Sequence, residues 1–369
     1  MSRIRVLHLI GSKGLYGAER VLLNLLPALR QSGIDVTLGC MSPLNSKGAD
    51  IGKELENINV PVVFMNEKRK FSGKSLLTIY RTIKKTNTNI LHVHGYKATI
   101  LGGFIARILG IPQVSTYHGE ARQVPELSTY VKIETYFLRR AARIVAVSKK
   151  IKEELISRGI SDDKISVIHN GIKDPLETQD GQRNYGKKKP ILPCLLCVGR
   201  LIKIKRFDLV IDAVKVLKKD YPKIVLSIAG EGPQDEILKK KVVDLELNDS
   251  VRFLGYVKDI KKLYQDTDIF VLPSDIEGAP IALIEAMAFS LPIIATSVGA
   301  VPDMIKSGKD AILIPPNSEK ELIESLRYLL LHPEICRVLG KTAREKFLEN
   351  YNSGIVAESY IKEYKKICN

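Results

Sequence analysis

The stretch from Ile269 to Val301 constrains the fold of this chain more than any other. Ile269–Leu272 is a short apolar run that ends at Pro273, and a polar turn with glycine and proline follows it. Residues 281–289 are good helix formers, and residues 291–296 are apolar again. This order predicts a buried strand, a loop, a helix and a second buried strand, which form a βαβ crossover in a parallel sheet. The loop precedes a helix N-terminus, where free backbone N–H groups bind anions such as phosphate.

Two carboxylates flank this predicted anion site. Glu277 lies in the loop, and Glu285 lies on the helix with seven residues between them. Glu285 stands among alanine, isoleucine, leucine and methionine, and a carboxylate in such surroundings is almost always paired with a partner. Pro280 is expected in the first helical turn, where its missing N–H costs nothing. Because a fold does not fix a function, a purely structural role for this unit stays open.

The segment Ser274–Ala288, SDIEGAPIALIEAMA, resembles the E-x7-E signature of the group 1 glycosyltransferases, family 4 of the retaining enzymes, which have the GT-B fold. The resemblance implies that Glu285 binds the ribose hydroxyls of a sugar nucleotide and that Glu277 faces the donor sugar. Where the family has an EGFG-like loop, this chain reads EGAP, so Pro280 supplies no amide. The loop residues implied in diphosphate binding are Gly278, Ala279 and Ile281.

A second cluster of candidate residues follows the predicted strand 193–198. Arg200 and Lys205 suit a diphosphate, Arg by its planar fork and Lys as a point charge, although surface ion pairs are the alternative. Their spacing is similar to the family's G-R-L-x-x-x-K motif, which binds the diphosphate. Gly230, in Gly-Glu-Gly-Pro, resembles the GxGP turn, and Val257 falls in a segment whose backbone meets the nucleobase in the family.

The first half of the chain repeats the alternation of strands and helices. Strand 3–10 leads through a glycine-spaced loop into helix 18–31, and the alternation continues to about residue 168, which predicts a parallel doubly wound sheet. Gly17-Ala18-Glu19-Arg20 is similar to the family's GGAER loop, so the resemblance implies that Gly17 approaches the diphosphate. Asp35 leaves a nicotinamide site as a weaker alternative, although the glycine spacing is not G-x-G-x-x-G.

Three histidines lie at predicted strand ends. His92 and His94 point to the same face of one strand, a spacing that suits a metal, but no third ligand lies nearby in the sequence. A packed or hydrogen-bonded imidazole is therefore the expectation for both. His118 is followed by glycine just past a strand, and the resemblance implies that it is the family's cleft histidine beside the donor sugar.

The 369 residues exceed one ordinary core and predict two domains. We predict an N-terminal, acceptor-side Rossmann-like domain at 1–173, a polar linker at 174–190 and a nucleotide-sugar-binding domain at 191–345. A helical segment at 346–369 is expected to cross back onto the first domain. The resemblance, which includes the HNGI element at 169–172, implies that the two α/β domains of a GT-B fold face each other across a cleft.

Composition limits where the protein works. The chain opens directly into a strand pattern without a secretory segment, and its five cysteines are irregularly spaced, so we expect a cytoplasmic protein.

Cys194 and Cys197 form a C-x-x-C within an apolar run and are expected to be core thiols. Asp266-Thr-Asp268 reads as a D-x-D metal motif, yet it directly precedes a buried strand, so a structural role is expected and no metal is predicted.

The charge is uneven along the chain. Residues 1–185 carry 28 Lys and Arg against 16 Asp and Glu, a net +12, whereas the remainder is +4. Basic clusters recur in the first half without interleaved aromatic residues, so nucleic acid is not expected. An anionic membrane surface or a phosphate-bearing acceptor fits better, with a solvated basic face as the alternative. The clusters are Lys68, Arg69, Lys70 and Lys74; Lys84 and Lys85; Arg139, Arg140 and Arg143; and Lys149, Lys150 and Lys152.

The resemblance implies a retaining glycosyltransferase that moves a sugar from a UDP- or GDP-linked donor to a hydroxyl of a glycan or lipid-linked acceptor. Cell-surface polysaccharide biosynthesis at the inner face of the membrane is the expected setting. A sugar-nucleotide epimerase of the same fold and a non-catalytic sugar-binding protein are the alternatives. The residues expected to act in catalysis are His118, Arg200, Lys205 and Glu277, and no cofactor is expected.

Overall fold

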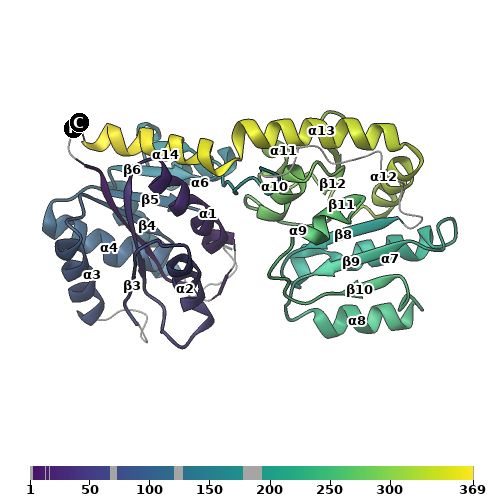
Figure 1. Ribbon diagram of the computed structural model, residues 1–369, viewed down its shortest axis with the longest axis horizontal. Coiled ribbons are helices and arrows are strands. Elements are labelled where there is room, and N and C mark those ends of the chain that lie inside the picture. The colour runs from purple at the N-terminus through teal and green to yellow at the C-terminus, as the bar shows by residue number, and fades with distance from the viewer. Residues whose placement is uncertain are drawn as a thin grey trace. The chain divides into compact units, whose positions relative to one another are not determined.

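The computed structural model describes residues 3–12, 14–15, 17–66, 73–119, 128–177 and 193–368. The chain divides into two compact units, each built on its own parallel sheet (Figure 1). Unit 1 comprises residues 1–173 and 351–369, and unit 2 comprises residues 174–350. Most of the predicted linker 174–190 and the basic residues Lys68, Arg69 and Lys70 lie outside the described residues.

Unit 1 contains a parallel sheet in the order β3-β2-β1-β4-β5-β6-β7. Its strands are apolar runs buried between helices, as expected where both faces of a parallel sheet are covered. The strands are β1 (Arg5–Ile10), β2 (Asp35–Cys40), β3 (Val62–Phe64), β4 (Ile90–His94), β5 (Gln113–Tyr117), β6 (Arg143–Ala146) and β7 (Ile165–Val167). The helices are α1 (Gly17–Gln31), α2 (Asp50–Asn57), α3 (Gly73–Lys85), α4 (Tyr96–Leu109), α5 (Ser128–Arg140), α6 (Lys149–Ser157) and α14 (Ser353–Cys368).

Unit 2 repeats this design with the order β10-β9-β8-β11-β12-β13. Every described strand pair in it is parallel, so helices must cross between consecutive strands. The strands are β8 (Cys194–Val198), β9 (Val225–Ala229), β10 (Val251–Phe253), β11 (Ile269–Leu272), β12 (Ile293–Thr296) and β13 (Ile312–Ile314). The helices are α7 (Phe207–Leu217), α8 (Asp235–Asp244), α9 (Lys261–Gln265), α10 (Ile281–Ala288), α11 (Val301–Met304), α12 (Glu319–Leu331) and α13 (Pro333–Asn350).

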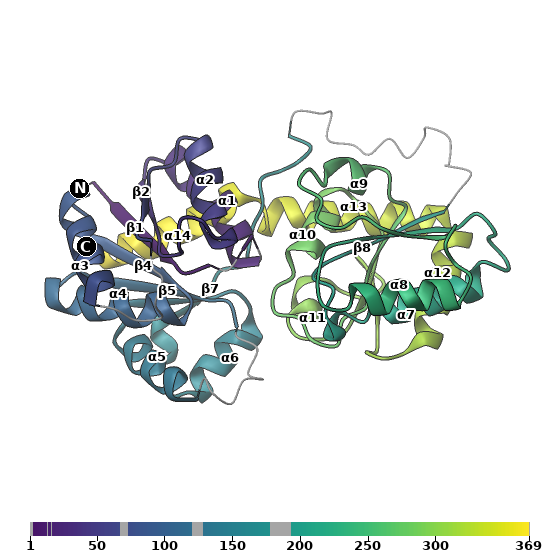
Figure 2. The same ribbon diagram turned by 90° about the horizontal axis from the view of Figure 1, so that it is seen from below.

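Each face of the unit 1 sheet has its own core. Val6 and Ile10 of β1 pack with α1, α2 and α14, whereas Leu7 and Leu9 pack with α3 and α4. Figure 2, seen from below, shows α14 beside α1, and the two helices are in contact along unit 1. The C-terminal helix therefore completes a core that the first residues of the chain begin.

The tail differs from the single helical segment expected at 346–369. It consists of α13 and α14, and the predicted boundary at residue 345 falls inside α13. The helix breaks at Tyr351 and Asn352 because the backbone there pairs with Ile172. The Ile172 N–H donates to the Tyr351 carbonyl at 3.0 Å, and the Ser353 N–H donates to the Ile172 carbonyl at 2.8 Å.

Among the described residues, none of the helices has the length and apolar character needed to span a bilayer.

Candidate active site

The candidate residues of unit 2 gather at one edge of its sheet. The strand order reverses between β8 and β11, which pair directly although two strands separate them in the sequence. In open α/β sheets, ligands bind outside the carboxyl ends of the strands at such a switch point. The loop after β8 carries Arg200 and Lys205, and the loop after β11 carries Glu277. The two predicted cations and the predicted acid therefore lie in the loops at the switch point, where sheets of this topology bind ligands.

Glu277 is a buried carboxylate held by two donors. The Lys205 ammonium lies 2.5 Å from Glu277 Oε1, and the Ser274 hydroxyl donates to the same oxygen at 2.6 Å. Both side chains of the ion pair are largely buried, so a paired charge is the stable arrangement. Lys205 ends the short 3-10 helix η4 (Lys203–Lys205). The structure therefore joins two residues that the sequence had placed 72 positions apart.

The loop after β8 carries a further arginine. Arg206 has left-handed backbone angles, with φ at 50°, and its guanidinium pairs with Asp208 at 3.1 Å and with Asp275 at 3.4 Å. The hydrogen bond to Asp208, followed by the charges of both carboxylates, raises the pKa of Arg206. These contacts fasten the β8 loop to the β11 loop beside Glu277. Arg200, by contrast, is exposed.

Two glycines allow the loops to approach one another. A Cβ atom at Gly299, which has a φ of +58°, would lie 1.7 Å from the Glu277 carbonyl oxygen. A Cβ atom at Gly230 would lie 1.8 Å from the Gly199 carbonyl oxygen, directly before Arg200. Real Cβ contacts are never this short, so both positions require glycine. The backbones that carry Glu277 and Arg200 are thus set by their neighbours after β12 and β9.

Glu285 lies buried on α10 and accepts a hydrogen bond from the Tyr264 hydroxyl at 2.7 Å. Tyr264 comes from α9, is fully buried, and stacks on Phe289 with ring centroids 5.2 Å apart. This partner explains how a carboxylate is tolerated among the apolar residues of α10. A charged acceptor fixed in this way is suited to binding hydroxyl groups.

The start of α10 supplies the predicted amide donors. Pro280 precedes the helix with extended angles, φ −68° and ψ 120°, so the helix begins at Ile281 and the expectation that Pro280 lies within the first turn was wrong by one residue. Gly278 is exposed, Ala279 is half-buried and Ile281 is buried. The first N–H groups of a helix lack intrahelical partners, and the helix dipole favours an anion near them.

In unit 1, His118 follows β5 at the carboxyl edge of the sheet. Its Nε2 atom is buried and has no hydrogen-bond partner among the described residues, while its ring centroid lies 6.0 Å from that of His94. Burial lowers the pKa of His118 to about 4, so the imidazole is neutral at pH 7. A neutral ring can donate or accept a hydrogen bond, which is what contact with a sugar hydroxyl requires.

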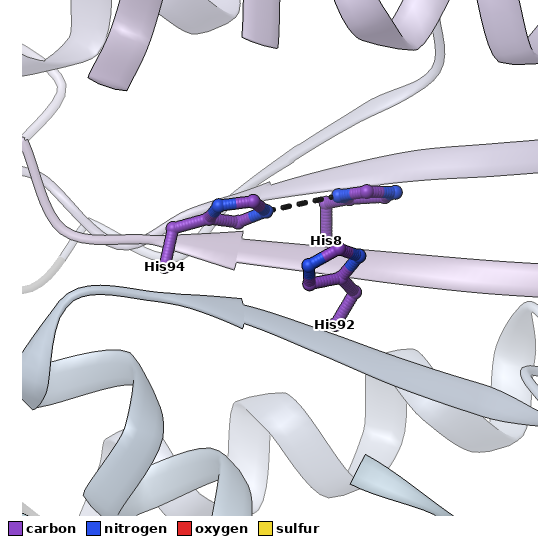
Figure 3. A group of neighbouring side chains, drawn as sticks. All are labelled: His8, His92 and His94. Carbon is purple, nitrogen blue, oxygen red and sulfur yellow. Dashed lines mark hydrogen bonds between the residues drawn. The ribbon is translucent and has the colours of Figure 1, made fainter. Parts of the chain in front are cut away.

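His92 and His94 meet a third histidine, His8, which the sequence reading missed. β1 and β4 are adjacent and parallel, and their register places His8 opposite His92 (Figure 3). His8 Nδ1 and His94 Nε2 are 3.1 Å apart, and one nitrogen of each of the three rings lies within 4.8 Å of the others. Imidazole nitrogens at this spacing could hold a transition metal such as Zn²⁺.

The nitrogens of this cluster are largely engaged with protein partners. His92 Nδ1 lies 2.6 Å from the Tyr364 hydroxyl of α14, and His92 Nε2 lies 2.7 Å from the Thr116 hydroxyl. Tyr364 also reaches His8 Nε2 at 3.4 Å. Burial lowers the pKa of His8 to about 3 and lowers the pKa values of His92 and His94 well below the ordinary range. The hydrogen-bonded imidazoles expected from the sequence are found, and the prediction of no metal stays a prediction.

The remaining predicted residues are Gly17, Val257, the C-x-x-C pair and the D-x-D segment. Gly17 begins α1, and a Cβ atom there would meet nothing within 4 Å; Val257 is half-buried after β10. Cys194 and Cys197 both lie on β8, and burial raises the pKa of the Cys197 thiol, as expected for a core residue. Asp268 Oδ2 accepts a hydrogen bond from the Cys194 N–H at 2.9 Å, which ties β11 to β8. Asp268 of the D-x-D segment therefore has a structural role, and the prediction that the segment binds no metal stays a prediction.

The sequence did not predict five residues that bind and position other side chains of these sites. They are His8, Arg206, Tyr264, Ser274 and Tyr364. Ser274 stood within the recognised motif, three residues before Glu277, so its spacing was a usable signal. Tyr264 and Tyr364 reach their partners from helices far along the chain, and only the sheet topology brings them together.

Comparison with known proteins is consistent with this geometry. Residues 178–346 match the family model described as glycosyl transferases group 1, and residues 16–174 match the model described as glycosyltransferase family 4. UDP-Gal:alpha-D-GlcNAc-diphosphoundecaprenol alpha-1,3-galactosyltransferase of Escherichia coli is 29% identical over 95% of this chain and 94% of its own.

Solved structures show the same fold. Anabaena HepE in complex with UDP superposes with a TM-score of 0.82 at 19% identity, covering 98% of this chain and all of that one. A glycosyltransferase from Rickettsia africae ESF-5 gives a TM-score of 0.83 at 20% identity, covering both chains fully. The protein is a glycosyltransferase with the two-domain α/β GT-B fold. It belongs to the group 1 glycosyltransferases, family 4, as the E-x7-E and G-R-L-x-x-x-K resemblances implied.

Proposed function

We propose that this enzyme transfers a sugar from a UDP- or GDP-linked donor to a hydroxyl of a glycan or lipid-linked acceptor in cell-surface polysaccharide synthesis, on the cytoplasmic side of the membrane. The observation that carries the proposal is the buried Lys205–Glu277 pair at the switch point of the unit 2 sheet, beside the first amides of α10. The Escherichia coli relative, named for UDP-Gal and a diphosphoundecaprenol acceptor, and the UDP complex of HepE support the donor and acceptor classes.

The leaving nucleotide develops negative charge on its diphosphate as the glycosidic bond breaks. Arg200, Lys205 and the backbone amides of Gly278, Ala279 and Ile281 supply positive charge and fixed dipoles for that charge. Each such preorganised donor contributes about 3 kcal/mol of barrier lowering in comparable sites. Glu285, held by Tyr264, binds the ribose hydroxyls, and Gly230 and Val257 line the nucleotide site. No metal takes part in this proposal.

Glu277 keeps the Lys205 ammonium in place and presents its second oxygen to the donor sugar. Retention of anomeric configuration follows from same-face attack, in which the departing phosphate accepts the proton of the acceptor hydroxyl. Neutral His118 contributes a hydrogen bond to the sugar, and Gly17 contributes a backbone approach to the diphosphate.

The test measures nucleotide release from several UDP- and GDP-sugars, with and without a diphosphoundecaprenol-linked acceptor. We expect release that depends on the acceptor, and a loss of about 100-fold in kcat/KM for Lys205→Ala and for Glu277→Gln. Lys218→Ala is the control, because Lys218 pairs with Asp249 at the surface of the same unit. Release without acceptor would favour the epimerase, and unchanged rates in both site variants would contradict the site assignment.

A further inference from the structure

Three neighbouring helices of unit 1 share one outer face. α3 packs against α4, and α4 packs against α5. α3 and α4 lie side by side in both views (Figures 1 and 2). A Cβ atom at Gly103 of α4 would lie 2.5 Å from the Phe137 ring of α5, so glycine is what lets these two helices approach so closely. Their inner sides cover the sheet, and their outer sides form the surface that we call the α3–α5 face.

The charges on this face are almost all positive. α3 carries four Lys and Arg residues, α4 carries two and α5 carries three. The acid within these three helices is Glu134, which is buried, with its carboxylate 3.6 Å from Arg158. The exposed cations have no ion-pair partner among the described residues; they are Lys74, Arg81, Lys84, Lys85, Arg107, Lys132, Arg139 and Arg140.

On other helices, lysines lie beside acids and pair with them. On α8, Lys239 pairs with Asp235 at 2.6 Å and Lys241 pairs with Asp212 at 2.6 Å. On α6, Lys152 pairs with Asp162 at 2.7 Å. The α3–α5 face differs in that none of its three helices carries an exposed acid, and like charges held together in this way favour an anionic partner.

Large apolar side chains are exposed among these cations. Ile108 is 59% exposed and Phe104 is 47% exposed on α4. Arg140 lies over the ring of exposed Tyr136, with 3.6 Å between its guanidinium carbon and the ring centroid. The exposed apolar set is Leu77, Tyr80, Phe104, Ile108, Ile133 and Tyr136. A partner that offers negative charge alone would leave these side chains in water.

We propose that the α3–α5 face binds the surface of an anionic lipid bilayer. Headgroup phosphates would pair with the lysines and arginines, and the aromatic and aliphatic tips would enter the boundary between headgroups and acyl chains. Nucleic acid matches the charge but does not bury such aliphatic side chains. The inference rests on the proposed function for its purpose, since an enzyme bound in this way would meet an acceptor anchored in the membrane.

The chain contains no tryptophan, so a single introduced indole reports on its own surroundings. We would compare Ile108→Trp on α4 with Ile237→Trp on α8, because both isoleucines are 59% exposed and α8 carries mixed charges. With vesicles of phosphatidylcholine and roughly one third phosphatidylglycerol, the Ile108→Trp emission should shift to the blue and be quenched by brominated lipid. The Ile237→Trp emission should stay unchanged.

A charge variant tests the same face by sedimentation with vesicles. Replacing Arg81, Lys84, Arg107 and Lys132 by Gln should weaken binding by about tenfold or more, and raising the salt from about 0.1 M to 1 M should do the same to the wild type. The matched control replaces four exposed lysines of unit 2 by Gln: Lys215, Lys219, Lys223 and Lys240. The control should bind as the wild type does.

Binding that ignores anionic lipid, an Ile108→Trp emission that does not respond, or equal loss in the control would overturn the inference. Binding to polyuridylate that vesicles fail to compete would also overturn it, because the partner would then be a nucleic acid. Vesicle binding is measured without donor or acceptor, and sugar transfer is measured with acceptor in detergent. A failure of membrane binding is thereby distinguished from a failure of the proposed transfer reaction.

Discussion

The buried acids of the candidate site are each held by a partner from another part of the fold. Glu277 is held by Lys205 and Ser274, and Glu285 is held by Tyr264. A buried polar group that loses its partner keeps the full cost of desolvation, so these partners hold the two carboxylates in a fixed orientation. Their loss should therefore affect nucleotide binding more than packing.

Tyr264→Phe tests this dependence at the residue scale. The change removes the hydroxyl that donates to Glu285 and keeps the ring that stacks on Phe289. Because a hydrogen bond to a charged group contributes about 1.5–3 kcal/mol, UDP affinity measured by calorimetry should fall about tenfold or more. Tyr328→Phe, which changes an exposed tyrosine on α12, is the control. Unchanged UDP affinity in Tyr264→Phe would contradict a role for Glu285 in ribose binding.

The sequence predicted the acids but not their partners. Glu277, Arg200 and Lys205 were found because each lies in a motif of fixed spacing just past a strand. Tyr264 was not, because its hydroxyl meets Glu285 only after α9 and α10 pack together, and no spacing within the chain encodes that contact. His8 was missed for a similar reason, since its neighbours come from a different strand.

At the scale of elements, the loops of unit 2 are fixed by direct contact between backbones. Gly299, in the loop after β12, lies against the Glu277 carbonyl group. The loop after β12 carries no predicted catalytic side chain, yet its backbone fixes the position of the loop that carries Glu277. A side chain at position 299 would have to displace the Glu277 backbone. We therefore expect a side chain at position 299 to lower both the free energy of unfolding and the transferase activity.

Gly299→Ala should lower the free energy of unfolding by at least about 2 kcal/mol and reduce kcat/KM by about tenfold or more, because strain and a backbone clash act together. Gly308→Ala is a matched control: its φ is +74°, but a Cβ atom there meets nothing within 4 Å. The control should lose only about 1 kcal/mol from the left-handed backbone and keep its activity. Equal losses in both variants, by denaturant unfolding and transfer assays, would show that the Glu277 contact is unimportant.

Most strands and helices followed from apolar periodicity, because buried parallel strands are short apolar runs and their crossover helices are longer and patterned. β11 was predicted residue for residue. The division of the tail into α13 and α14 was not predictable, because it depends on backbone pairing with Ile172, almost 180 residues earlier in the chain.

Across the whole molecule, the buried histidines are distributed unequally between the two units. His8, His92, His94 and His118 lie in unit 1, and burial lowers all four pKa values. In unit 2, His332 lies at the surface beside Glu334. A histidine whose folded pKa lies below its unfolded value binds its proton first in the unfolded chain, so stability falls as the pH drops below about 6.5.

Unit 1 should therefore lose stability in mild acid before unit 2 does. For His8, with a folded pKa of about 3, the loss at pH 5 amounts to about 2 kcal/mol relative to pH 7 or above. Hydrogen exchange at pH 7.5 and pH 5, corrected for the intrinsic rate, should show protection falling in β1, β4 and α14 while β8 and β11 stay protected. Loss of protection in unit 2 first would contradict this account, and His332→Gln should change neither unit.

The interruption of unit 1 by unit 2 has a consequence for synthesis. The apolar face of α1, with Leu22, Leu25 and Leu29, is closed by α14, which the ribosome produces only after the whole of unit 2. Unit 2 is continuous from Asp174 to Asn350 and can fold as soon as it emerges, whereas the part of unit 1 that is made first must wait for α14. A nascent chain released a few turns early would thus keep a finished C-terminal lobe and an N-terminal lobe in need of a chaperone.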